Sequence, residues 1–516
     1  MEREARFKQD RILTNIISES SGEYVLPDYK GDVRKILLTK AKAVPTGKYP
    51  GQGRVEYVGN VIYSVVYLDG ENRLCGVEFS TDYQLDVKCD EENYVDSICH
   101  TRVANFNIRL MGPRKFNAKA NLESSVNMSE TRTLSVEGDA ATRDDAELYS
   151  ETVSVGASLI GETKGREYKE SVCDIDGAIE EEVEILLINT EPRVNSVTVR
   201  DGEADVLGEV LLTVLISRNE EMPYTVSAKI PISERVSVEG IREGMEATGY
   251  MYVTETAPSF TESEEGVTLF AEISVDVEVF ASVSEDVVVY RDMYLCDSET
   301  ENKYGVFTYP TPYEQFSLAE NVSLETPVSE CGIEKIRNVV YGIASVIPEE
   351  INVSEKAVNI KGKIRVSGIA CEINEAGGLE YAPIKFDSYV DINANNSCQI
   401  KNGNVKNSDI RVRDFCITND ADKIYTSFAL ELRGSCCGSK DITALISSFI
   451  SGSYDKRDKS EVVVYYPESD DTLFGIAKKY HTTAMDIASA NSLTESVFNS
   501  MGQTGALSGI KKLIIR

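Results

Sequence analysis

The side chains that most often carry enzyme chemistry are scarce in this sequence. It contains only two histidines, His100 and His481, and no tryptophan. Histidine is the commonest general base and a frequent metal ligand, and these two stand far apart in the chain. The chain therefore lacks the histidines that most catalytic triads and histidine-rich metal sites require. The residue types favour a binding or structural protein over an enzyme.

Three short segments approach a ligand-binding motif but lack a decisive residue. Gly156–Thr163 nearly spells a phosphate-binding loop, with Glu162 where that motif needs a lysine. Asp174–Gly177 begins like a calcium loop, but its glycine comes too early and a third acidic position is missing. Cys436 and Cys437 are adjacent, whereas zinc sites space their thiolates by two or more residues. We therefore expect no catalytic residues, no metal site and no cofactor.

Charge and cysteine content restrict the partners and the compartment. The 516 residues include 85 acidic and 53 basic side chains, a formal net charge of -32. This charge repels nucleic-acid backbones and anionic membranes, because both recruit proteins through lysine and arginine. The first 20 residues lack the apolar core of a signal peptide, and no stretch reaches the ~18 apolar residues of a membrane span. The eleven cysteines are odd in number and scattered. We expect reduced thiols inside a cell, no nucleic-acid partner and no membrane span.

Two apolar markers recur three times along the chain at matched spacing. The first is a strand-like segment with an internal glycine, and its copies are centred on Gly59, Gly208 and Gly362. These glycines are 149 and 154 residues apart. The second is an apolar triplet that precedes each glycine at nearly the same offsets, at Ile36–Leu38, Ile185–Leu187 and Val339–Tyr341. Two markers at matched offsets predict a threefold repeat.

Each copy has the alternation of a β-strand. Val61–Tyr67 and Val210–Ile216 place apolar side chains on one face at the two-residue period of a strand. Turn-forming clusters such as Asp69–Asn72 end these runs. Many short strands at this spacing predict a mainly β fold with one sandwich-like unit per repeat. The recurring glycine is expected to mark a β-bulge or a close approach of two backbones.

The composition changes after residue 450. Residues 451–460 are polar, with glycine, serine and mixed charge, and predict a linker with few apolar groups to join its two flanks. Residues 461–516 hold six acids and five bases, so residues 1–460 carry -31 of the net charge. The C-terminal part is therefore the least repulsive region for an acidic partner.

Residues 461–516 predict a small β-α-α-β unit. Val462–Tyr466 reads as a short strand, and Leu473–Tyr480 has the apolar spacing of one helix face, with Asp471 as the expected N-cap. A second short helix is expected between Thr483 and Asn491. Leu513–Ile515 reads as a closing strand.

Tyr465–Leu493 resembles a LysM domain. The early Asp-Thr-Leu motif of that family stands at Asp471–Leu473, and its Ile-Ala-x-x-Tyr helix stands at Ile476–Tyr480. Its Asn-x-Leu motif after the second helix stands at Asn491–Leu493. The glycine that the family places before Asp-Thr-Leu is Asp470 here. The resemblance implies a small α+β domain.

The upstream repeats resemble SPOCS domains, through the Leu26-Pro27 lead-in, the apolar triplet and the glycine-containing strand. SPOCS repeats followed by a LysM domain resemble the family of SipL-type spore-coat morphogenetic proteins. The implied divisions are an N-terminal lead at 1–21, SPOCS repeats at 22–170, 171–325 and 326–450, a linker at 451–460 and a LysM domain at 461–516.

That family resemblance implies a non-enzymatic adaptor in endospore coat assembly. It would act in the cytoplasm, on the mother-cell side of the forespore surface, with its LysM domain docking a coat morphogenetic ATPase and with other coat proteins as partners. The alternative is a protein that binds the N-acetylglucosamine polymers of peptidoglycan, because LysM domains bind sugar through the turn and the loop that match Asp470–Leu473 and Asn491–Leu493. The carboxylate of Asp470 favours a protein partner. A further possibility is that these residues only cap helices and pack the core.

The expected binding face combines these two segments with the lysines of the first helix, of which at least one should point outward. Its residues are Asp470, Asp471, Thr472, Leu473, Lys478, Lys479, Asn491, Ser492 and Leu493.

Overall fold

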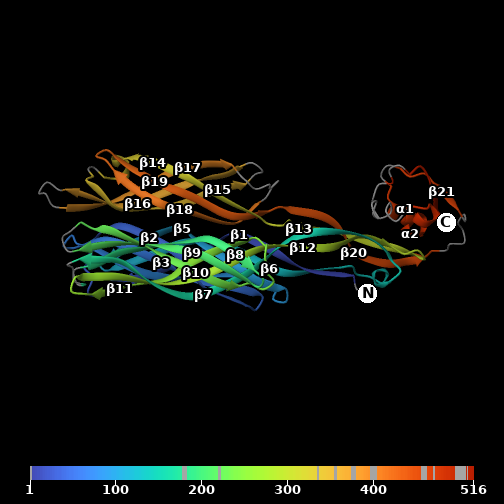
Figure 1. Ribbon diagram of the computed structural model, residues 1–516, viewed down its shortest axis with the longest axis horizontal. Coiled ribbons are helices and arrows are strands. Elements are labelled where there is room, and N and C mark those ends of the chain that lie inside the picture. Colours follow the sequence, from blue (N-terminus) through green and yellow to red (C-terminus); the bar gives the residue numbers. More distant parts are fainter. Residues whose placement is uncertain are drawn as a thin grey trace.

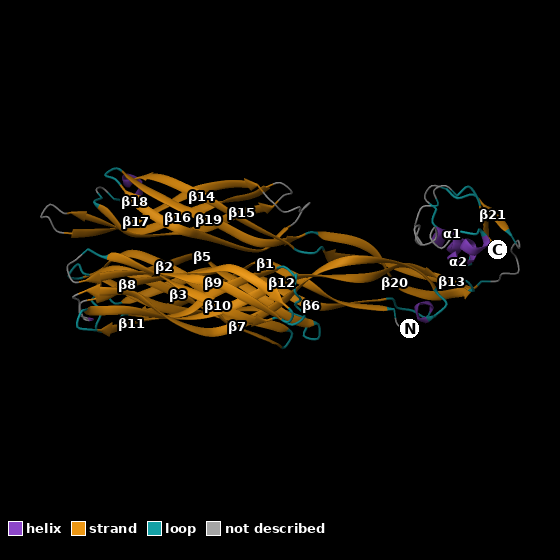
Figure 2. Ribbon diagram, viewed as in Figure 1, coloured by secondary structure: helices purple, strands orange, loops and turns teal. Residues whose placement is uncertain are grey.

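The computed structural model is an elongated molecule built mainly of β-strands (Figures 1 and 2). The sheets of the described residues form three β-sandwiches. They lie at one end of the molecule, and a narrow stalk of strands leads to a small domain with α1 and α2 at the other end (Figures 1 and 2). The structure describes all residues except 1–2, 177–179, 181–182, 219–221, 334–335, 354–356, 374–378, 396–403, 455–461, 469–470, 494–506, 508–509 and 516. In this part of the chain, no helix has the length and apolar character needed to cross a membrane.

The first sandwich, in its described residues, holds six strands in two three-stranded sheets. The strands are β1 (Glu4–Val25), β2 (Val33–Gly51), β3 (Arg54–Asp69), β4 (Leu74–Lys88), β5 (Tyr94–Gly112) and β6 (Lys115–Ser135). One sheet has the order β1-β6-β5 and the other β2-β3-β4. Tyr63 and Val65 of β3 are fully buried with Phe116 and Leu122 of β6 in the core that the sheets share.

The second and third sandwiches repeat this topology over their described residues. The second consists of β7 (Glu147–Asp176), β8 (Val183–Arg200), β9 (Glu203–Arg218), β10 (Tyr224–Ser237), β11 (Ala247–Glu262) and β12 (Gly266–Tyr294). The third consists of β14 (Glu314–Pro327), β15 (Asn338–Val353), β16 (Ala357–Ile373), β17 (Leu379–Asn395), β18 (Asn404–Asn419) and β19 (Lys423–Cys437). Short 3₁₀ helices, η1 (Ala140–Thr142) and η3 (Val328–Cys331), precede β7 and β15. In each sandwich the last strand lies between the first and the fifth, and the third lies between the second and the fourth. The mainly β fold and the threefold pattern follow the sequence markers.

The limits of the sandwiches differ from those expected. Residues 4–21 of the expected N-terminal lead belong to β1, which pairs with β6 along almost its whole length. The divisions after residues 170 and 325 fall inside β7 and β14, and the start of the linker at 451–453 is the end of β20 (Ser439–Ser453). The apolar triplets lie on the second strand of each sandwich and the recurring glycines on the third. A repeat that is defined by these two markers therefore leaves most of the first strand of a sandwich in the preceding repeat.

The recurring glycines lie on the central strands β3, β9 and β16, opposite a β-bulge in the neighbouring strand. The paired residues directly before each register shift are Gly59 and Pro45, Gly208 and Val194, and Gly362 and Pro348. A Cβ atom at Gly208 would lie 2.3 Å from the carbonyl oxygen of Arg193, and the other two glycines meet a carbonyl oxygen of the bulged strand at 2.4 and 2.5 Å. The expected bulge and the expected close approach are both confirmed.

The apolar triplets of the three repeats meet in one core between the sandwiches. Leu37 and Leu38 of β2 pack with Leu186 and Leu187 of β8 and with Tyr341 of β15, and all five are buried. Full burial of such a side chain contributes about 1.5–3 kcal/mol. This shared core therefore joins the three sandwiches into one body.

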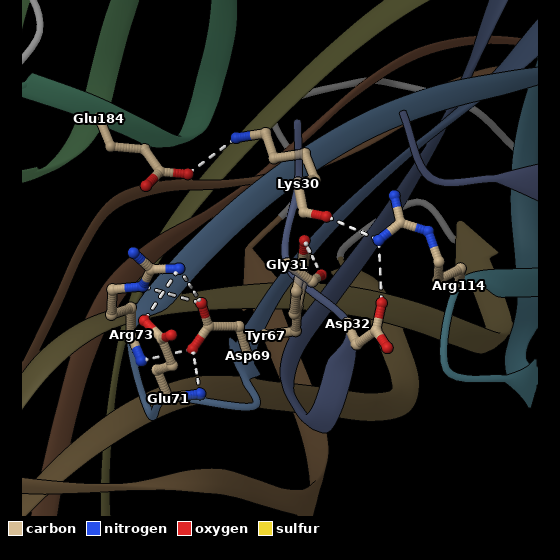
Figure 3. A network of polar contacts seen from close by, with 9 residues as sticks. All are labelled: Lys30, Gly31, Asp32, Tyr67, Asp69, Glu71, Arg73, Arg114 and Glu184. Atoms are coloured by element: carbon tan, nitrogen blue, oxygen red, sulfur yellow. Dashed lines mark hydrogen bonds and ion pairs between the residues drawn. The ribbon is translucent and has the colours of Figure 1, made fainter. Parts of the chain in front are cut away.

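A polar network lies beside this core, at the loop between β1 and β2 (Figure 3). Asp69 is 1% exposed and accepts hydrogen bonds from two backbone amides of the β3–β4 turn and from the guanidinium of Arg73. Arg114 donates to the carbonyl oxygen of Lys30, and the Nζ of Lys30 lies 2.7 Å from the Oε1 of Glu184 on β8. The last contact crosses from the first sandwich to the second.

The stalk extends the strands of the second sandwich. The first part of β7 pairs with the last part of β12, and β13 (Ser298–Pro310) pairs with β20 in a separate sheet. The two layers share a core with Phe7 of β1, formed by Val153, Val155, Val287, Val289, Tyr309, Ile442 and Ala444. The stalk is thus a packed double layer and not a single extended ribbon.

The C-terminal domain has the expected β-α-α-β order. Its elements are β21 (Val463–Tyr465), α1 (Leu473–Tyr480), α2 (Ala484–Ala490) and β22 (Leu513–Ile515), and β21 pairs antiparallel with β22. Leu473, Ile476 and Ala477 of α1 are buried against Ile487 of α2 and Leu513 of β22.

We predict that Gly208→Ala destabilises the chain, because the added Cβ meets a backbone carbonyl that the bulge holds in place. The expected loss is about 1–3 kcal/mol in the free energy of unfolding, measured by urea denaturation. Gly70→Ala is the matched control, because a Cβ at that turn position meets nothing within 4 Å. Equal effects of the two substitutions would show that the close approach is no constraint.

Candidate binding site on the C-terminal domain

Side chains of the turn before α1 are bonded within the domain. Thr472 is the N-cap of α1, because its Oγ1 accepts a hydrogen bond from the amide of Gly475 at 3.0 Å. Asp471, the expected N-cap, stands one residue earlier, and its Oδ2 accepts from the hydroxyl of Tyr465 and from a backbone amide, both at 2.8 Å. Threonine therefore caps the helix, while the aspartate ties the turn to β21. Asp470 lies outside the described residues.

The segment after α2 is held in the same way. The side-chain amide of Asn491 donates to the carbonyl oxygen of Ile514 and accepts from the amide of Ile514, both at 2.7 Å. Leu473 is 3% exposed, and Leu493 packs against the same core. Ser492 is exposed and has a φ of 53°. Of these expected site residues, Ser492 is the one whose side chain faces solvent, and the other three build the domain.

The two lysines of α1 have different surroundings. The Nζ of Lys478 lies 2.7 and 2.6 Å from the carboxylate oxygens of Asp292, near the end of β12. Lys479 is exposed, with its Nζ 5.3 Å from the ring centroid of Tyr465 and 5.8 Å from that of Tyr480. Lys479 is therefore the lysine that points outward, whereas Lys478 joins the domain to the stalk.

Aromatic side chains of the stalk dock the domain. Tyr294, at the end of β12, is 2% exposed and belongs to the core of the C-terminal domain. Its ring centroid lies 5.2 Å from that of Phe474 in an edge-on arrangement, and Tyr149 of β7 lies 5.7 Å from the same ring. The hydroxyl of Tyr294 donates to the carbonyl oxygen of Thr482 at 2.8 Å. One wall of the small domain is thus supplied by the stalk.

The turn between the two helices adds to this contact. The ring of His481 stacks on Tyr454, with centroids 3.7 Å apart, and its Nδ1 lies 3.3 Å from the carbonyl oxygen of Leu295. The expectation concerned residues 451–460, which offer few apolar groups, but most of the joining groups come from β7 and β12, far from that segment in the sequence. Tyr454 is the contact that the described part of this segment supplies. The polarity of the segment therefore did not reveal how the two parts are joined.

β21 presents an apolar strip on its outer face. Val462, Val464 and Tyr466, in β21 or next to it, are 53%, 51% and 70% exposed. Ile514 of β22 pairs with Val464, and the exposed Lys512 precedes β22. Exposed apolar side chains grouped on one face are typical of interaction surfaces. Val462–Tyr466 are all apolar or aromatic, without the apolar-polar alternation of a half-buried strand. The sequence therefore did not reveal which of these side chains face solvent.

Comparisons with known proteins agree with this architecture. Residues 183–257, within the second sandwich, match the family model of SipL, SPOCS domain. Residues 468–498 match the LysM domain model. The C-terminal domain is a LysM domain. Neither the curated proteins nor the solved structures gave a match to this chain.

The two matches confirm the resemblance to SipL-type proteins, in which a SPOCS domain is combined with a C-terminal LysM domain. Both are non-catalytic binding domains, and together they fit a sporulation coat protein with a module of the peptidoglycan-binding type. Gly156–Thr163 is extended backbone inside β7. Among the described residues, no group of three or more histidine, cysteine, aspartate or glutamate side chains could hold a metal ion.

A polar cavity lies between the first and second sandwiches. Lys48 of β2, Glu162 of β7 and both Asp276 and Glu278 of β12 contribute to its lining. The Nζ of Lys48 lies 2.7 Å from Asp96 and 3.8 Å from Glu162. The Oε2 of Glu278 is buried and makes no hydrogen bond with the residues that the structure describes. Burial raises the pKa of Glu278 to about 7, although Lys48 acts in the opposite direction.

We predict that Tyr294→Phe loosens the LysM domain on the stalk, because the carbonyl oxygen of Thr482 loses its buried donor. A lost hydrogen bond of this kind costs about 0.5–1.5 kcal/mol. Hydrogen exchange of peptides that span α1 should become several-fold faster at this scale of free energy. Tyr29→Phe is the control, since Tyr29 is 83% exposed. Unchanged exchange in Tyr294→Phe would contradict the docking contact.

We also predict a pH dependence from Glu278. Its folded-state pKa of about 7 lies above the ordinary 4.5, so the folded chain binds this proton more tightly than the unfolded chain. The resulting stability is fully present below about pH 4.5 and is lost as the pH rises through about 7. Glu278→Gln should remove this loss and stabilise the chain by about 1–3 kcal/mol at pH 8.

Denaturation of wild type and variant at pH 4.5 and pH 8 measures the effect of Glu278. Glu264→Gln, at an exposed turn position, removes the same charge outside the cavity. If Glu278→Gln keeps the wild-type difference in stability between the two pH values, the carboxylate is not the responsible group.

Proposed function

We propose that this chain is a non-enzymatic adaptor in bacterial endospore coat assembly. The observation that carries the proposal is the fixed mounting of the LysM domain. Tyr294, Phe474 and the Lys478–Asp292 pair hold the domain on the stalk, at a distance from the sandwiches (Figure 2). A rigid spacer between two binding parts suits a protein that joins partners, because little freedom is lost when both are bound.

The partner proposed for the LysM domain is a coat morphogenetic ATPase at the forespore surface, on the mother-cell side and in the cytoplasm. The SPOCS and LysM matches support this through the resemblance to SipL-type proteins. The first and third sandwiches share the strand order of the matched second sandwich, which supports treating all three as SPOCS repeats. Other coat proteins are proposed as partners of these repeats.

The docking face proposed on the LysM domain is the β21 strip with the lysines beside it. Val464 and Tyr466 supply exposed apolar area, and Lys479 and Lys512 supply positive charge. In an adaptor with a net charge of -32, these side chains offer the attraction that an acidic partner needs. Lys478 has no part in this face, because Asp292 holds it.

The alternative function is peptidoglycan binding, which the LysM match itself favours. The Oδ2 of Asp471, the Oγ1 of Thr472 and the Oδ1 of Asn491 accept hydrogen bonds within the domain. Among the described residues of this site, a sugar would therefore depend mainly on backbone groups, Ser492 and the second carboxylate oxygen of Asp471. This alternative needs no rigid stalk, whereas an adaptor does.

Capture from a lysate of sporulating cells with the tagged full chain distinguishes the two functions. Recovery of the ATPase supports the adaptor, and the same chain should then fail to sediment with purified peptidoglycan. Sedimentation with peptidoglycan, without capture of the ATPase, supports the alternative and rejects the adaptor.

We predict that Lys479→Glu weakens capture of the ATPase by about tenfold or more, because a like charge across an interface can cost several kcal/mol. Quantitative pull-down measures the effect, with circular dichroism to verify folding. Lys385→Glu is the matched control, because Lys385 is exposed on β17 of the third sandwich. Equal capture by the two folded variants would place the docking face elsewhere.

A further inference from the structure

Among the described residues, four arginines meet where the second and third sandwiches touch. Arg193 lies on β8, Arg411 and Arg413 lie on β18, and Arg433 lies on β19. The last three line a pocket together with Glu431 of β19 and residues 248–251 of β11. So many guanidinium groups in one place need a cause, because like charges repel and the chain as a whole is strongly acidic.

Three of these arginines connect the two sandwiches. Arg411 and Arg433 donate to carbonyl oxygens of β8, at 2.6 and 2.9 Å. Arg193 reaches in the opposite direction and donates to Asp414 of β18 at 2.9 Å. Their hydrogen bonds account for their place at the joint between the sandwiches.

The position of Arg413 is not explained by a hydrogen bond between the two sandwiches. Its side chain is 12% exposed, and its Nε lies 2.8 Å from the Oε2 of Glu431. This contact is an ion pair without hydrogen-bond geometry, because the Nε is buried and makes no hydrogen bond with the residues that the structure describes. A guanidinium has five N–H donors, so the donors of Nη1 and Nη2 are left for a ligand in the pocket. Glu431 is shared, since the Nη2 of Arg433 lies 3.7 Å from the same oxygen.

The lining of the pocket carries three guanidinium groups against the one carboxylate of Glu431, which favours a negative ligand. Burial lowers the pKa of Arg413, and the neighbouring charges of Arg433, Arg193 and Arg411 lower it further, against the carboxylate of Glu431. The carboxylates Glu191 and Glu209 lie near Arg193, at 3.8 and 3.9 Å. An anion would offset both the lost hydration of Arg413 and the repulsion between the guanidinium groups.

We propose that this pocket binds a small oxyanion, a phosphate or a carboxylate group, through the guanidinium groups of Arg413 and Arg433. The planar fork of an arginine matches two oxygens of such a group. Arg433 is already bonded to β8, so a bound oxyanion links the second and third sandwiches. The site lies on the sandwiches and is independent of the function proposed for the LysM domain.

The test uses the full chain with inorganic phosphate as the probe. Isothermal titration calorimetry at constant ionic strength, with sodium chloride as the reference salt, should show saturable binding of phosphate. A parallel titration with sodium acetate separates the two sources of the oxyanion. Stronger binding of phosphate assigns the site to a phosphoryl group, and equal or stronger binding of acetate assigns it to a carboxylate. Saturable binding of neither overturns the proposal.

Variants locate the binding at the pocket. Arg413→Gln should weaken binding of the preferred anion by about tenfold or more, because bonds to a charged group are lost. Arg413→Lys keeps the charge beside Glu431 and should fold, yet it also should bind more weakly, because it lacks the fork. Arg365→Gln is the control, since Arg365 pairs with Asp387 in the other sheet of the third sandwich and does not line the pocket. Wild-type affinity in a folded Arg413→Lys chain, or equal losses in the control, would overturn the site.

Discussion

The antiparallel pairing of β7 with β12 is the interaction on which the rest of the molecule depends. These strands are 30 and 29 residues long and pair along nearly their whole length. Within the second sandwich, Val275 and Val277 of β12 are fully buried. Beyond it, the same two strands form one layer of the stalk. The core of the second sandwich thereby determines where the distant LysM domain lies.

The register of this pair also sets how the domain is held. The register shifts last between Tyr290 and Asp292, and such a bulge changes which side chains share a face. After the shift, Asp292 and Tyr294 stand two residues apart, so they point to the same side of the strand. Asp292 binds Lys478, and Tyr294 enters the LysM core. An ion pair and an apolar contact therefore act together.

The three sandwiches become one body through contacts of different kinds. The apolar triplets meet in a shared core, Lys30 pairs with Glu184 between the first two sandwiches, and arginines bond β8 to the third. The recurring glycines allow the bulged neighbours of the central strands to approach closely. A body joined in this way can act as a fixed platform, while the exposed side chains of β21 remain accessible at the far end.

Local and periodic signals predicted much of this protein. Strand alternation, the spacing of Gly59, Gly208 and Gly362, and the apolar face of α1 depend on near neighbours along the chain. These signals indicated the mainly β fold, the threefold repeat, the bulges and the β-α-α-β order of the C-terminal unit, whereas the LysM assignment rested on a resemblance of short motifs. The limits of the sandwiches were less clear, because a first strand pairs with a sixth strand about 100 residues later and leaves no sign of this in its own pattern.

The use of individual side chains was decided by the tertiary structure. Lys478 and Lys479 are neighbours of the same type, and the sequence by itself determined only that at least one should face solvent. The fold chose between them, because it brings Asp292, 186 positions away, against Lys478. The enclosed carboxylate of Glu278 and the arginines around Arg413 likewise arise where two sandwiches meet. The burial and the charge of a side chain at such a joint depend on residues of two different repeats. These residues are distant in the sequence, so no local sequence pattern shows that they come together.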